Sequence, residues 1–156
     1  MLESAARLHD EGKKASRWQR AFRAPPGGGP YAKTTGPLSV ALLDGYRHEF
    51  GSIGEAENDA DLKTLPADLR ALALHLIAAH HGFARPLIGT GGCEDAPPSA
   101  SVLEDRASRV ALRFASLQKA WGPWGLAWWE ALLRAADQQA SRASEDPTLD
   151  GSEEAA

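Results

Sequence analysis

Two stretches rich in Pro and Gly set the main limits on how this chain can fold. They cover residues 24–30 and 89–101, and neither composition suits the interior of a helix or a strand. Elsewhere, apolar residues recur three and four positions apart, and no alternating strand pattern of useful length occurs. The sequence therefore predicts an all-α fold, a helical bundle of about five or more helices with two Pro/Gly-rich loops.

Helical spacing also places the individual elements. We expect helices over residues 2–22 with a break near Gly12, from about 37 toward 48, and over 69–81, 101–121 and 124–141. Gly51 and Gly54 would end the second helix, and Gly82 would cap the third. Gly122 and Pro123 would separate the last two helices.

Composition excludes several classes of protein. The 156 residues suit one domain with a real core, since 43% of them are apolar. Cys93 is the only cysteine, which excludes a disulfide scaffold and fits a reducing compartment. No apolar run approaches the ~18 residues that span a bilayer, and Glu3 and Arg7 interrupt any signal-like stretch. We therefore expect a cytoplasmic protein with no membrane partner.

The formal net charge of −4 averages over unlike parts of the chain. Residues 145–156 hold five acids and no base, so we expect residues 144–156 to form an acidic, disordered tail. Residues 1–35 carry seven bases against three acids, a basic front that can favour phosphates. Residues 1–143 are assigned to a single domain.

Polar residues interrupt the apolar faces of two predicted helices. At about 100° per residue, His80 falls in the middle of the apolar face of the helix over 69–81, and His81 falls at its edge. Asp137 falls on the apolar face of the last helix. Structural interpretations stay open, because His80 could be a satisfied core residue and Asp137 could lie in water. His75 falls on the opposite side and is interpreted as a surface or packing residue.

Six polar residues on four separate helices or helix ends form a candidate set: His9, Asp10, His48, His80, His81 and Asp137. A helical bundle can bring such residues together in its core. Imidazole nitrogen and carboxylate oxygen suit divalent Mn, Fe, Co, Ni or Zn. A carboxylate such as that of Asp10 can bridge two ions about 3.5–4 Å apart, and such a pair can cleave a phosphate ester. The set therefore indicates a transition-metal site.

The order His-Asp, His, His-His, Asp resembles the HD superfamily of metal-dependent phosphohydrolases. Four local strings carry the likeness: His9-Asp10-Glu11-Gly12-Lys13, Arg47-His48-Glu49, Ala78-Ala79-His80-His81-Gly82 and Leu133-Arg134-Ala135-Ala136-Asp137. Together they resemble the HD nuclease domain of CRISPR-associated type I interference systems, the domain that works with a DNA helicase. The similarity covers most of residues 2–142.

The resemblance implies a metal-dependent phosphodiesterase, an endonuclease that cleaves single-stranded DNA in the 3′-to-5′ direction. Its partners would be the CRISPR-associated helicase and the RNA-guided surveillance complex, and its cofactors would be two divalent metal ions. Asp10 would bridge the two ions, and Lys13 would orient Asp10 or a phosphate. The other ligands would divide between the two sites, His48, His80 and His81 at one, His9 and Asp137 at the other.

One part of the family pattern is missing. Family members carry a further metal-binding His on a helix before the His-Asp motif, and the eight residues that precede His9 contain none. We therefore expect a domain that lacks its first helix and one ligand of the His9–Asp137 site. Two alternatives remain open: an HD phosphohydrolase of nucleotides or small phosphate esters, and an inactive remnant or docking module.

The basic front supplies candidate DNA contacts. Arg17, Arg20 and Arg23 would meet phosphates, and Trp18 would stack on bases. Trp18 and Phe22 are four residues apart, so packing in the core is the alternative for these aromatic rings. The tryptophans of the last helices, Trp121, Trp124, Trp128 and Trp129, are interpreted as helix-packing residues.

Overall fold

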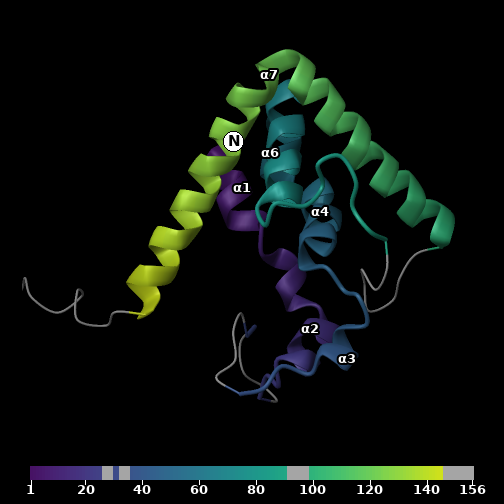
Figure 1. Cartoon of the computed structure of the whole chain (residues 1–156), viewed down its shortest axis with the longest axis vertical. Coiled ribbons are helices and arrows are strands. Elements are labelled where there is room, and N and C mark those ends of the chain that lie inside the picture. Colours follow the sequence, from purple (N-terminus) through teal and green to yellow (C-terminus); the bar gives the residue numbers. More distant parts are fainter. Residues whose placement is uncertain (26–29, 32–35, 91–98, 146–156) are drawn as a thin grey trace, which may run out of the picture.

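The computed structural model describes residues 1–25, 30–31, 36–90 and 99–145. Within them every regular element is helical, which confirms the predicted all-α class. In chain order the elements are α1 (Leu2–Leu8), the 3₁₀ helix η1 (Glu11–Lys14), α2 (Ser16–Ala21), α3 (Val40–Leu43), α4 (His48–Asn58), α5 (Ala60–Thr64), α6 (Ala67–Ala79) and α7 (Ala100–Glu145) (Figure 1). Parts of both predicted loops and residues 146–156 of the predicted tail lie outside the described residues.

Helix α6 forms the centre of the molecule. Its Leu72, Leu76 and Ile77 are fully buried and belong to the same core as Phe50 of α4 and Leu133 of α7. Burial of each such side chain contributes about 1.5–3 kcal/mol. Figure 1 shows α6 between α4 and α7, with α1 alongside, and these elements contact one another. None of the described helices is both long and apolar enough to cross a bilayer.

Helix α7 consists of two arms that meet at a sharp bend. The bend lies at Gly122, whose φ of 67° and ψ of 167° are not helical, and Pro123 follows it. This region of backbone conformation suits glycine, and proline has no N–H to continue the helix. The predicted break is therefore confirmed. The second arm, yellow-green in Figure 1, returns past α6 and α1.

Several boundaries differ from those predicted, most of them by one or two residues, and α5 was not predicted. Helix α4 passes through Gly51 and Gly54 and ends at Asn58, so the expectation that these glycines end a helix is wrong. Both lie where α4 packs closely on neighbours: Gly51 is buried, and a methyl group on Gly54 would lie 3.2 Å from the Arg106 guanidinium. Tertiary contact here outweighs the low helix propensity of glycine.

The segment before α4 is not one continuous helix either. Residues 37–39 are not helical, α3 spans only Val40–Leu43, and Asp44 follows in the left-handed conformation with a φ of 47°. At the other end of the chain, α7 continues to Glu145. Residues 144 and 145 therefore belong to the helix and not to the predicted tail.

Candidate metal centre

Three helix ends meet at the candidate site. His9 and Asp10 lie between the end of α1 and the start of η1, and His48 is the first residue of α4. His80 and His81 follow the end of α6. The ends of a helix carry backbone N–H and C=O groups that have no partner within the helix. Polar side chains can therefore gather at the ends of helices with little loss of apolar packing.

A buried hydroxyl joins the His-Asp segment to α4. Ser52 Oγ donates to the His9 carbonyl oxygen at 2.7 Å and accepts from the Gly12 amide at 2.8 Å. A methyl group on Gly12 would lie 2.1 Å from the His48 carbonyl oxygen, so no larger residue fits. These contacts fix η1 against the first turns of α4. Sequence reasoning gave Ser52 no role; its only signal was a small polar residue between Phe50 and Ile53.

The Asp10 carboxylate lies at the centre of the cluster. Its Oδ2 is 2.7 Å from Lys13 Nζ and 3.4 Å from His9 Nε2. Its Oδ1 is 3.4 Å from His48 Nε2 and 3.8 Å from His80 Nε2. Each oxygen of this one carboxylate thus faces a different part of the histidine set, as a bridging ligand requires.

Backbone carbonyls fix the orientation of two imidazoles. Nδ1 of His9 lies 2.7 Å from the Ala6 carbonyl oxygen, and Nδ1 of His80 lies 2.7 Å from that of Ile77. A carbonyl only accepts, so Nδ1 carries a proton in both rings, and the neutral form of each ring has its lone pair on Nε2. Metal-binding histidines are typically held in this way. Nε2 of His48 and Nε2 of His80 are 3.2 Å apart.

Two acceptors in the cluster are buried without a hydrogen-bond partner in the described part of the chain: His9 Nε2 and Asp10 Oδ1. A buried acceptor left unsatisfied costs about 1–3 kcal/mol. A cation between these atoms would remove that cost. Nitrogen and oxygen donors of this kind fit a divalent transition metal, so the residues present suit the expected cofactor.

All six predicted ligands lie in this one region. Donor atoms of His48, His80 and His81 lie within 4.8 Å of one another, as do those of His9, Asp10 and His80. Asp137, half-buried on the second arm of α7, places its Oδ1 3.3 Å from His9 Nε2. Asp137 therefore does not point away into water, and His81 is the exposed member of the group.

No protein-family model, curated protein or solved structure matches this chain. The chemistry of the centre is therefore inferred from the residues that form it.

The electrostatics of the centre favour metal-binding protonation states. Burial opposes ionisation of Asp10, but its contacts with His48 and Lys13 hold the pKa of Asp10 well below its usual value. Burial lowers the pKa of His80 to about 4, and the neighbouring histidines add to this shift. Burial also lowers the pKa of His81. At neutral pH the centre thus offers an ionised carboxylate on Asp10 and neutral imidazoles on His80 and His81, the forms that bind metals.

A buried carboxylate on α4 also supports the centre. Glu49 is 3% exposed, and its Oε2 lies 3.6 Å from His48 Nδ1. Its Oε1 accepts a hydrogen bond from the Arg47 guanidinium at 2.8 Å. Burial opposes ionisation of Glu49, but His48 and Arg47 lower its pKa overall. The charge of Glu49 therefore favours a proton on the nearer nitrogen of His48, Nδ1, which would leave Nε2 to bind a metal. Sequence reasoning gave it no role.

The expected DNA contacts fit only in part. Trp18 is 9% exposed and stacks on Phe22, with ring centroids 4.1 Å apart. Its buried ring leaves no face for a base, so the stacking role is wrong and the packing alternative fits. The Arg17 guanidinium lies 3.8 Å from the Asp44 carboxylate, and Arg20 and Arg23 are exposed.

The structure decides between the two interpretations of His75 and corrects that of two tryptophans. His75 is 1% exposed and its Nε2 lies 2.7 Å from Glu130 Oε1, so it is a packing residue and not a surface one. Trp124 and Trp128 are 87% and 57% exposed, so the helix-packing role expected of them is wrong. Of the four tryptophans on α7, Trp129 packs against the core.

Proposed function

We propose that this protein is a metal-dependent phosphodiesterase that cleaves single-stranded DNA. The observation that carries the proposal is the half-buried Asp10 carboxylate among the Nε2 atoms of three histidines, with a buried acceptor without a hydrogen-bond partner on Asp10 itself and another on His9. His48, His80 and His81 would hold one divalent ion together with Asp10. His9 and Asp137 would hold a second, which Asp10 also contacts.

Bound divalent ions would supply an activated water and stabilise the charge that develops on a phosphate ester during cleavage. The protein keeps the Asp10 carboxylate ionised through Lys13 and His48. Lys13 Nζ donates to Asp10 Oδ2 and its side chain is 18% exposed, so the ammonium group can also meet a substrate phosphate. Glu49 and the Ile77 carbonyl orient His48 and His80.

The number of ligands suits a catalytic role. His9, Asp10 and Asp137 give the second ion three protein ligands, and catalytic metal sites typically leave a position open for water or substrate. The family resemblance expects one further His at this site. Three ligands bind less tightly than four, so the His9–Asp137 site is expected to be the weaker of the two.

The choice of single-stranded DNA as substrate rests on the family resemblance and on the basic front. The exposed guanidinium groups of Arg20 and Arg23 lie on the segment that follows the His-Asp motif. Exposed cations of this kind bind phosphates without regard to sequence. In this proposal the chain acts in the cytoplasm with a helicase and an RNA-guided complex that expose the strand.

A cleavage assay tests the proposed function. Labelled single-stranded DNA is incubated with the protein and Mn²⁺ or Co²⁺, beside duplex DNA and mononucleotides. We expect cleavage of the single strand, its loss with EDTA, and its loss in Asp10→Asn. Asp68→Asn, an exposed carboxylate on α6, serves as the matched control and should cleave like the wild type.

Two results would overturn this proposal. Hydrolysis of mononucleotides but not of DNA would favour a phosphohydrolase of small phosphate esters. Absence of hydrolysis of every substrate by a folded, metal-supplied protein would favour a non-catalytic remnant or docking module.

A further inference from the structure

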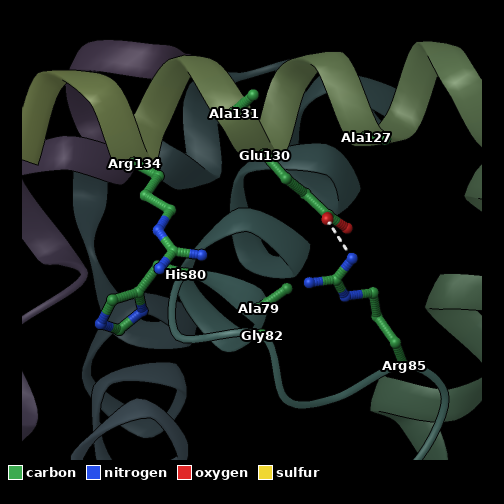
Figure 2. Close-up of a pocket in the computed structure, with 8 residues that line it drawn as sticks. All are labelled: Ala79, His80, Gly82, Arg85, Ala127, Glu130, Ala131 and Arg134. Atoms are coloured by element: carbon green, nitrogen blue, oxygen red, sulfur yellow. Dashed lines mark ion pairs between the residues drawn. The ribbon is translucent and has the colours of Figure 1, made fainter.

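A pocket of about 210 Å³ lies beside the metal centre, between the end of α6 and the second arm of α7. His80 lines it and also belongs to the metal centre, so the two sites share a wall. Figure 2 shows the α7 side chains Glu130 and Arg134 reaching toward the α6 end, where Arg85 approaches from the opposite side.

The charges that line this pocket favour an anion. Arg85 pairs with Glu130 at 2.9 Å, and the other oxygen of Glu130 contacts His75 at 2.7 Å. Arg134 is exposed and has no ion pair or hydrogen bond to any other residue in the described ranges, and Figure 2 shows its guanidinium beside His80. Two guanidinium groups against one carboxylate leave one positive charge in excess. A guanidinium without a partner, next to a phosphate-cleaving centre, suits a second phosphate.

The size of the pocket limits what it can hold. Apart from its charged groups and His80, it is lined by Ala79, Gly82, Ala127 and Ala131, whose small side chains leave the space open. Sites for whole drug-sized ligands occupy about 300–1,000 Å³. The smaller volume here suits a phosphate group with part of its sugar.

We infer that this pocket is a phosphate subsite that binds the phosphate next to the one being cleaved. Arg134 is its principal donor and Arg85 the second. The role in cleavage rests on the proposed function of the metal centre, whereas binding of phosphate to the pocket does not need a metal. The subsite would favour a substrate that carries a second phosphate over a diester that carries only one.

Phosphate binding is tested first without metal. ¹H–¹⁵N NMR spectra of the full chain in EDTA are recorded with increasing inorganic phosphate at constant ionic strength. We expect saturable shifts of the Gly82 and Ala131 amides in the wild type. Arg134→Gln should weaken binding about tenfold, as expected for loss of a charge-assisted hydrogen bond.

Two further variants separate a specific pocket from a general effect of charge. Arg142→Gln removes an exposed arginine from the same helix and should bind phosphate like the wild type. Ala131→Leu fills the pocket without changing charge and should abolish the shifts. Equal binding by Arg134→Gln and the wild type, or no saturable shift in the wild type, would overturn the inference.

Cleavage then connects the pocket to the metal centre. The dinucleotide TpT has one phosphate, whereas pTpT and TpTp carry a second one on either side. With Mn²⁺, the wild type should show a lower KM for one of the longer substrates than for TpT, and Arg134→Gln should lose that difference between substrates. Equal KM values for all three in the wild type would overturn the subsite. Phosphate binding without any hydrolysis would support the subsite and overturn the proposed function.

Discussion

Gly12 illustrates how one residue sets the geometry of the centre. Its amide binds Ser52, its carbonyl accepts from the Tyr46 hydroxyl, and its α-carbon lies against the backbone of His48. Gly12 has only hydrogen in place of a side chain, so η1 can lie directly against the start of α4. This close packing sets the relative positions of Asp10 and His48.

Gly12→Ala is therefore expected to be strongly destabilising. The added methyl group would lie 2.1 Å from the His48 carbonyl oxygen, so the backbone must shift. Overpacking of this kind costs about 1–3 kcal/mol, which urea unfolding would measure. Gly89→Ala is the matched control, since its methyl group would meet nothing within 4 Å. Equal stability of the two variants would show that η1 does not pack on α4 as described.

Glu49 acts on the centre through His48. Glu49→Gln retains the shape of the side chain but removes the charge that holds a proton on His48 Nδ1. Loss of such an outer partner typically lowers metal affinity 10–100-fold, and we expect this range in a Co²⁺ titration followed by visible absorption. Glu55→Gln, exposed on the same helix, should titrate like the wild type. Unchanged affinity in Glu49→Gln would remove its positioning role.

At the scale of elements, a single carboxylate links α1 to α5. Asp59 caps α5 by accepting from the Leu62 amide at 2.9 Å, and both its oxygens accept from Arg7 of α1. The Leu62 amide and Arg7 lower the pKa of Asp59 from its ordinary value of 3.8. A lowered pKa means that the ionised form stabilises the fold. This stabilisation is present above about pH 4 and is lost as the pH falls through the lower pKa of the folded state.

Asp59→Ala should therefore lower the free energy of unfolding at pH 7 by about 1 kcal/mol, the usual cost of losing a helix cap. Its stability should also fall less steeply than that of the wild type below pH 4. Asp61→Ala removes an exposed partner of the same arginine and should cost less. Urea unfolding at several pH values would measure both effects; parallel pH profiles for Asp59→Ala and the wild type would contradict the assignment.

The elements also show what sequence patterns could and could not predict. Apolar spacing predicted α6 and the bend at Gly122, because a long periodic pattern and a Gly-Pro pair are local signals. The continuation of α4 through Gly51 and Gly54 was missed, because it depends on packing against other helices. Histidines on an apolar face predicted members of the centre. The roles of Ser52 and Glu49 could not be predicted from the sequence, because each role depends on partner residues that only the fold brings near.

At the scale of the whole molecule, the centre depends on the packing of α1, α4, α6 and α7. The bend in α7 returns its second arm to α1, which brings Asp137 to His9. The same arm carries Arg134 and closes one side of the pocket. Metal ions that bind only the folded chain should raise its stability, by about 2.7 kcal/mol at a free concentration 100 times Kd.

The central claim is that these distant residues share bound cations. The most direct measurement is the metal content per chain, by elemental analysis after loading with Co²⁺ and removal of free ion. We predict two ions in the wild type and in Asp68→Asn, and none retained in folded Asp10→Asn, because Asp10 contacts both sites. A wild-type chain that retains no ion, or an Asp10→Asn chain that retains as many as the wild type, would contradict the account.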